Sequence, residues 1–105
     1  MPLNISSEVK GSAAHITLAG ELDSSTAGAV RKAVEEVLVG SPASLLLFVE
    51  QLNFMASAGL RVLIFAKQRS PDLKVYVVKP QEAILDTLRK TGFYQSVYVV
   101  DAVPT

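Results

Sequence analysis

Ser57 is the residue best placed to do chemistry, because it stands in a turn of small residues, Ala56-Ser57-Ala58-Gly59. The run before this turn, Leu45 to Val49, is apolar at every position, and the run after it, Leu60 to Ala66, is apolar except for Arg61. A short, fully aliphatic run is typical of a strand buried on both faces. The pattern therefore predicts a serine hydroxyl at the exposed end of a buried strand.

A helix is expected directly after the turn, because Leu60, Leu63 and Ile64 recur at helical spacing. The N–H groups at the start of a helix lack partners within the helix, and the helix dipole is positive there. A phosphate on Ser57 would therefore meet favourable donors. The plainer role for Ser57 is that of a helix N-cap, and this role is compatible with phosphorylation.

A nucleophilic serine is disfavoured. The hydrolase nucleophile elbow requires glycine two residues before and two residues after the serine. Gly59 satisfies the second position, but Met55 occupies the first. A serine triad also requires a histidine base, and the one histidine, His15, falls inside a predicted strand. We therefore expect no catalytic residue and no enzymatic activity.

Strands and helices alternate along the rest of the chain. A hairpin is expected from two strands joined by a turn at Lys10-Gly11-Ser12, and each later strand is separated from the next by a helical pattern. The expected strands cover residues 3–9, 15–18, 45–49, 74–78 and 97–100, and a tail covers 101–105. In the first strand Leu3, Ile5 and Val9 alternate with polar residues, so a half-buried strand is expected. This order predicts an α/β fold: one domain over residues 1–105 with a mixed sheet of four to five strands, packed with three or more helices.

The helix ends carry recognisable signals. Asp23, Ser24 and Ser25 are all good N-cap residues for the first helix, and the sequence does not choose between them. The apolar face of this helix is expected to carry Ala27, Val30, Val34, Val37 and Leu38, and the other face largely Arg31, Lys32, Glu35 and Glu36. Gly40-Ser41-Pro42 is expected to end that helix. Lys79-Pro80-Gln81-Glu82 is expected to open the third helix, and Gly92, Phe93 and Tyr94 follow it, with both aromatic residues packing back onto the body.

Composition excludes several classes of function. Ten basic and ten acidic residues give a net charge of zero, so a nucleic-acid binder is not expected. The absence of cysteine and the single histidine argue against a metal site, and no glycine pattern of a nucleotide-binding loop occurs, so no cofactor is expected. No apolar run approaches the roughly 20 residues that span a bilayer. Since Met1-Pro2-Leu3-Asn4 lacks the features of a signal peptide, we expect a cytoplasmic protein without membrane insertion.

The segment Phe54-Met55-Ala56-Ser57-Ala58-Gly59-Leu60 resembles the phosphorylation-site signature of the STAS-domain family of bacterial anti-sigma factor antagonists. That signature is an apolar pair, an Asp, a Ser, a Ser or Ala, and then Gly-Leu. The resemblance gives Ser57 the place of the phospho-acceptor and Gly59-Leu60 that of the helix start. Ala56 and Phe48 depart from the family pattern, which often has an acidic residue at both places, so the surroundings of Ser57 are less acidic than usual.

The resemblance implies a function in transcription control. Such a protein binds an anti-sigma factor with serine-kinase activity and so frees a sigma factor; the kinase phosphorylates it, and a phosphatase restores it. The protein itself is a monomer or weak dimer with no catalytic activity. On this basis the phosphorylation site is Ser57, and the residues expected to contact the partner are Asp23, Ser24, Met55, Ala56, Ser57, Ala58, Gly59 and Arg61.

Ordinary structural roles are an alternative explanation for several of these residues. Asp23 is also explained as a helix cap, Met55 as core, and Arg61 as a solvent-facing residue. Gly59 is better explained as a position that lets the helix start lie close to a neighbour. Two other functions also remain. One is a non-catalytic STAS scaffold or accessory subunit of a stress-signalling assembly or lipid transporter, which Ala56 leaves open. The other is a small enzyme or nucleotide-binding module, which the missing phosphate loop disfavours.

Overall fold

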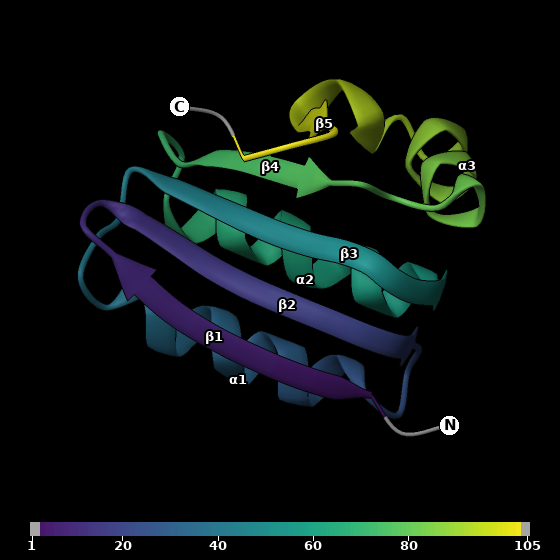
Figure 1. Cartoon of the computed structure of the whole chain (residues 1–105), viewed down its shortest axis with the longest axis horizontal. Coiled ribbons are helices and arrows are strands. Elements are labelled where there is room, and N and C mark those ends of the chain that lie inside the picture. The colour runs from purple at the N-terminus through teal and green to yellow at the C-terminus, as the bar shows by residue number, and fades with distance from the viewer. Residues whose placement is uncertain (1–2, 104–105) are drawn as a thin grey trace.

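A five-stranded mixed sheet carries the fold, and its strands lie side by side in the order of the chain, β1-β2-β3-β4-β5 (Figure 1). The computed structural model describes residues 3–103. The elements in chain order are β1 (Asn4–Lys10), β2 (Ala13–Leu22), α1 (Ala27–Leu38), β3 (Ser44–Met55), α2 (Ser57–Arg69), β4 (Lys74–Val78), α3 (Glu82–Lys90), a 3-10 turn η1 (Phe93–Ser96) and β5 (Tyr98–Val100).

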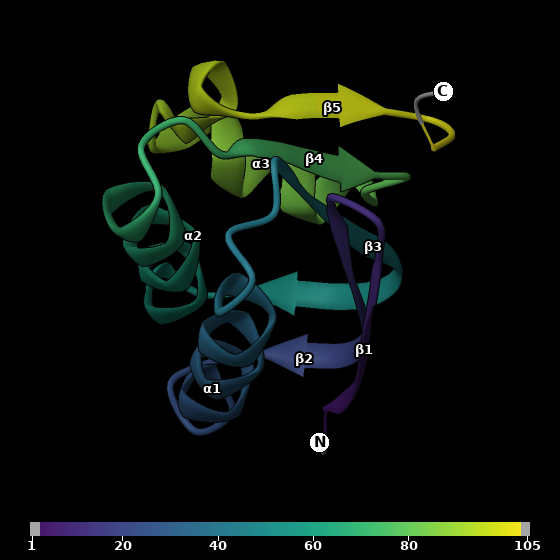
Figure 2. The same ribbon diagram turned by 90° about the vertical axis from the view of Figure 1, so that its left-hand side faces the viewer.

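Only the first pair of strands is antiparallel. β1 and β2 form a hairpin around Gly11, whose φ of +60° suits a glycine, and every later neighbour in the sheet is parallel. Each parallel pair is joined through a helix, as parallel pairing requires. α1 and α2 lie side by side on one face of the sheet (Figure 2). The predicted α/β class, mixed sheet and helix count are therefore confirmed.

β3 is the central strand and is longer than predicted. Its first half is buried as expected: Leu45, Leu47 and Val49 are at most 1% exposed. The sequence prediction ended this strand at Val49, but β3 continues to Met55. It continues because the pairing with β2 accommodates two register irregularities, one of them between Gly20 and Glu21. Polar residues in the second half hid this continuation, and the strand bends strongly along its length (Figure 2).

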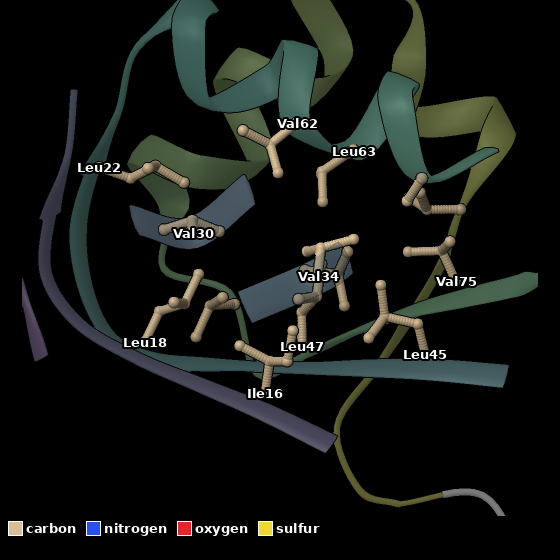
Figure 3. Packing of buried hydrophobic residues seen from close by; sticks show 14 of the residues in the cluster. Ile16, Leu18, Leu22, Val30, Val34, Leu45, Leu47, Val62, Leu63 and Val75 are labelled. Atoms are coloured by element: carbon tan, nitrogen blue, oxygen red, sulfur yellow. The ribbon is translucent and has the colours of Figure 1, made fainter. Parts of the chain in front are cut away.

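The core lies between the sheet and the helices (Figure 3). The strands contribute residues such as Ile16, Leu47 and Val75, and α1 contributes Val30 and Val34, all at most 1% exposed. The apolar face predicted for α1 is therefore confirmed.

The buried stripe of α2 differs from the one predicted. Leu60 and Leu63 are buried, but Ile64 is 37% exposed and Val62 is only 4% exposed. α2 packs against both the sheet and α1, so the face that turns inward includes Val62 and excludes Ile64.

Several other boundaries and exposures also differ from the sequence predictions. Val9 is 53% exposed because β1 is an edge strand, so β1 is less buried than its alternation suggested. α3 begins at Glu82, with Pro80 before it. Phe93 packs against the core, whereas Tyr94 lies on the surface with the Arg89 guanidinium 5.5 Å from its ring. Residues 104 and 105 of the predicted tail lie outside the described residues.

α3 supports the second half of β3. The Gln81 side-chain amide donates to the carbonyl of Glu50 at 2.8 Å, and the Thr87 hydroxyl donates to the carbonyl of Met55 at 3.4 Å. Ile84 and Leu88 of α3 are fully buried in the same core. The strand end that leads into Ser57 is thus held from the α3 side.

Candidate phosphorylation and partner-binding site

The ends of β2 and β3 bring two segments of the predicted site together. Leu22 and Met55 are partners in the parallel ladder, and the Ala56 N–H donates to the Leu22 carbonyl at 2.8 Å. Asp23 directly follows Leu22, the last residue of β2, and Ser57 lies two residues after Met55, the last residue of β3. Because both strands run in the same direction, the loop that starts at Asp23 and the turn that carries Ser57 leave the sheet at the same edge.

Ser57 is the first residue of α2, and its side chain is exposed. The N-cap is Ala56, in an extended conformation with φ −83° and ψ 170°. The helix closes its first turn on the Ala56 carbonyl, which accepts from the N–H groups of Gly59 at 3.0 Å and Leu60 at 3.2 Å. The suggested N-cap role of Ser57 is therefore wrong, as is a helix start at Gly59-Leu60: α2 begins two residues earlier.

The residues around Ser57 divide into an accessible pair and a buried pair. Ala56 and Ala58 are partly exposed, so a partner can reach the backbone on both sides of Ser57. Met55, 4% exposed, and Gly59 are buried. The side chain of Met55 therefore belongs to the core, where it supports the turn from beneath, and is not on the surface where we expected a partner contact.

Gly59 allows α2 to begin close to the end of β2. A Cβ added to Gly59 would lie 2.5 Å from Cγ and 2.8 Å from Cδ2 of Leu22, and 3.3 Å from Cγ of Met55. Real Cβ atoms do not come this close to a neighbour. The prediction that Gly59 permits a close approach is confirmed, and this close contact helps to fix where Ser57 lies relative to β2.

The Asp23 loop is held by hydrogen bonds to one carboxylate oxygen. Asp23 Oδ1 accepts from the Ser25 hydroxyl at 2.6 Å, from the Ser25 N–H at 2.9 Å and from the Thr26 N–H at 3.2 Å. Among residues 3–103, no group donates to the other oxygen, Oδ2. These bonds, that from the Ser25 hydroxyl foremost, lower the pKa of Asp23 below its ordinary value of 3.8. A fixed, ionised carboxylate thus stands at the edge that carries Ser57.

The N-cap prediction for α1 needs a correction. The structure places Thr26 at the N-cap position, and not Asp23, Ser24 or Ser25. The Thr26 hydroxyl points back, where it accepts from the Asp23 N–H at 2.9 Å and donates to the Glu21 carbonyl at 2.9 Å. Asp23 therefore stabilises a turn ahead of the helix, and Ser24 lies exposed on that turn.

A groove of about 250 Å³ lies between α1 and α2, next to the turn that carries Ser57. Arg61 lines it together with a residue that sequence reasoning missed, Arg31, whose guanidinium carbon lies 4.3 Å from the centroid of the Phe65 ring. The full lining is Ala27, Gly28, Arg31, Ala58, Arg61, Val62 and Phe65. Arg31 was assigned to the outer face of its helix, and only the packing of α1 on α2 shows that it borders this groove.

The other surfaces of the described residues provide weaker candidates for a functional site. Within residues 3–103, no three His, Cys, Asp or Glu side chains are grouped as a metal site would need. In the same part of the chain, no helix has both the length and the apolar character to cross a membrane. A larger hollow, about 470 Å³, lies beside Lys74 at the start of β4, and no predicted site residue lines it. His15 lies on the sheet with its ring 5.3 Å from that of Phe48.

Solved structures with the same fold include anti-sigma factor antagonists. One from Mycobacterium paratuberculosis has a TM-score of 0.86 at 21% identity, covering 97% of this chain and 88% of that one. SpoIIAA in its unphosphorylated form has a TM-score of 0.70 at 21% identity, covering 95% and 90%. The phosphorylated form of the Bacillus cell fate determinant SpoIIAA has a TM-score of 0.72 at 17% identity, covering 95% and 92%. At these identities the likeness shows a shared fold.

A search of curated protein sequences found no match. The model of one family, the STAS domain, matches residues 4–105, which is nearly the whole chain. That match agrees with the fold that the chain shares with the solved antagonist from Mycobacterium paratuberculosis. The chain therefore belongs to the STAS domain family.

Proposed function

We propose that this protein is an anti-sigma factor antagonist controlled by phosphorylation of Ser57. It binds an anti-sigma factor that has serine-kinase activity, and the bound anti-sigma factor releases its sigma factor. The observation that carries the proposal is the position of Ser57, which is exposed on the first turn of α2 between two small residues and beside the Asp23 loop.

Ser57 is suited to accept a phosphoryl group from a kinase that docks on this edge. The serine oxygen forms a bond to the γ-phosphorus of ATP, the bond to ADP breaks, and a base of the kinase takes the hydroxyl proton. The small side chains of Ala56 and Ala58 leave the approach to Ser57 open. The kinase supplies ATP and catalysis, so the protein itself needs neither a nucleotide site nor a catalytic residue.

Phosphorylation acts on the bound state more than on the fold. A phosphate adds about −1.5 to −2 charges at neutral pH. In the free protein this charge meets solvent and the N–H groups at the start of α2, so the fold is preserved. A partner packed against Ala56 and Ala58 would instead meet added bulk and a desolvated charge. Phosphorylation can act as a switch only if it destabilises the bound state more than the free state, and these contacts supply such a difference.

Comparison with the neighbours supports the proposal. SpoIIAA, an anti-sigma factor antagonist, has been solved in phosphorylated and unphosphorylated forms, and this chain shares its fold. We extend that behaviour to this chain because Ser57 has the place of the phospho-acceptor in the family signature. The same proposal includes a phosphatase that resets Ser57, a cytoplasmic location, and a monomer or weak dimer.

One observation favours a second function. Ala56 is partly exposed at the position where the family often has an acidic residue. A kinase that recognises an acidic side chain at this position would therefore have none to bind. A non-catalytic STAS scaffold, in a stress-signalling assembly or as an accessory subunit of a lipid transporter, does not need that acid.

A pull-down from the source organism separates the two functions. Tagged parent protein and a Ser57→Ala variant are used as baits, and Ser57 of the parent is examined by mass spectrometry. Recovery of an ATP-binding anti-sigma factor by both baits, with phosphate on Ser57 of the parent, supports the switch. Recovery of an oligomeric or membrane complex, with Ser57 unmodified, overturns it in favour of the scaffold.

A further inference from the structure

We propose that Arg61 binds the phosphate on Ser57 and that this pairing removes one of the two cationic side chains from the groove between α1 and α2. The inference rests on the proposed phosphorylation of Ser57 and assigns the residue that recognises the phosphate within the same chain. It gives Arg61 a role in each state of the switch.

The spacing on α2 places the two side chains together. Ser57 is the first residue of the helix and Arg61 stands four residues later. Residues at this spacing are neighbours on one face, about 5–6 Å apart between Cβ atoms. Helical side chains lean toward the N-terminus, so the long side chain of Arg61 extends back over the first turn, where Ser57 lies exposed.

Arg61 has no competing partner in the described part of the chain. Within residues 3–103 its guanidinium takes part in no ion pair and does not stack on an aromatic ring. α2 itself, Ser57–Arg69, contains no acidic residue. Arg31 is different: it pairs with Glu35 at 3.8 Å and lies over Phe65. Of the two arginines in the groove, Arg61 is therefore the one free to move toward a phosphate.

A phosphate on Ser57 would change the groove through this one residue. Arg31 and Arg61 both line the groove, with Ala58, Val62 and Phe65 among its apolar residues. Two guanidinium groups around an apolar surface are suited to a carboxylate-bearing segment of a partner. When Arg61 pairs with the phosphate, one cation is neutralised and the dianion stands beside Ala58. The groove then repels the acidic segment that it attracted before.

The experiment measures the phosphate directly and needs no kinase or partner. Phosphoserine is incorporated at position 57 of the full chain during translation, and the second pKa of the phosphate is measured by ³¹P NMR titration. A nearby cation favours the dianion and so lowers this pKa. We expect the pKa to be about half a unit lower in the parent than in Arg61→Gln, and Arg61→Lys to recover part of the shift.

The matched control is Arg69→Gln, which makes the same change in net charge on the same helix but at its far end. It should leave the phosphate pKa as in the parent. Equal values in the parent and in Arg61→Gln, or equal shifts from Arg61→Gln and Arg69→Gln, would overturn the inference. Because the phosphate is installed during translation, this outcome is distinct from failure of the proposed function, which would appear as absence of phosphate on Ser57 in the cell.

Discussion

The Leu22 side chain fills the space where a Cβ of Gly59 would stand, with its Cγ only 2.5 Å from that position. Leu22 is the last residue of β2 and is 1% exposed, so it has little room to withdraw. The start of α2 therefore approaches the end of β2 as closely as the backbone allows. Since Ser57 and Asp23 flank this contact in the sequence, it sets the distance between the two halves of the candidate site.

Replacing Gly59 with Ala should therefore destabilise the protein. The added methyl would overlap Leu22 and force a shift, and overpacking of this kind typically costs about 1–3 kcal/mol. The free energy of unfolding is measured by urea denaturation. The control is Gly28→Ala on α1, where a Cβ meets nothing within 4 Å; alanine is the better helix former there, so stability should hold or rise. Equal stability of both variants would contradict the close contact.

A charge at the centre of the sheet should be far more damaging. Leu47 is 1% exposed in the first half of β3, the central strand, so Leu47→Asp places an unpaired carboxylate among apolar side chains. A change of this kind typically costs several kcal/mol. The control is Gln51→Asp, at an exposed position later in the same strand, and it should cost much less stability. A Leu47→Asp variant that melts at the parent temperature would show that β3 is not the core strand.

The sequence predicted the fold class well because strands and helices each have a distinct apolar pattern. The fully aliphatic run at Leu45–Val49 and the helical spacing of Val30 and Val34 follow from packing on a sheet, and the structure confirms both. The second half of β3 was missed because Glu50, Gln51 and Asn53 break the apolar pattern. They are accommodated there by irregular pairing with β2 and by contacts from α3.

The candidate site was only partly predictable. Ser57 could be singled out as a candidate because a distinctive local pattern surrounds it, and its phosphorylation stays a prediction. The groove was not found, since Arg31 and Phe65 have no signal of their own and meet only when α1 packs against α2. The close approach at Gly59 was predicted, but the residue that it approaches, Leu22, lies more than 30 residues earlier in the chain and could not be named from the sequence. Local periodicity carries no information on such contacts.

The lowered pKa of Asp23 predicts a specific dependence of stability on pH. A carboxyl group whose pKa is lower in the folded state stabilises the fold above its unfolded value of 3.8, and this contribution is lost as the pH falls through the folded pKa. Asp23→Asn lacks that titration. The parent should therefore be slightly more stable than the variant at pH 5–7, and the difference should shrink below pH 3.8. Urea denaturation across this range would show a constant difference if the hydrogen bonds to Oδ1 had no such effect.

Asp23→Asn should also weaken binding of the anti-sigma factor while the loop keeps its shape. An asparagine oxygen can accept the bonds from Ser25 and Thr26, so only the charge and the free oxygen Oδ2 are lost. Binding is measured by calorimetry with the partner recovered in the pull-down. The exposed carboxylate of Glu36, near the far end of α1 and outside the predicted site, provides the control, Glu36→Gln, which should bind like the parent. Unchanged affinity of Asp23→Asn would limit Asp23 to holding the loop.

The switch itself is tested by two substitutions of Ser57. Ser57→Ala removes the phospho-acceptor without adding bulk, and alanine is a good helix former at this first position of α2. It should bind the anti-sigma factor like the parent and take up no phosphate. Ser57→Asp places a negative charge at the edge where we propose that the partner packs against Ala56 and Ala58. It should bind at least tenfold more weakly, which corresponds to about 1.4 kcal/mol.

Stability separates this effect from damage to the fold. Ser57 is exposed, and a carboxylate is favourable near a helix N-terminus, so Ser57→Asp should unfold at or above the parent temperature. A loss of affinity without a loss of stability then places the change at the interface. Equal affinities for Ser57→Ala and Ser57→Asp, or phosphate incorporated into Ser57→Ala at the parent level, would contradict the switch. The scaffold function would then be favoured, because it needs contact with this edge but no charge on Ser57.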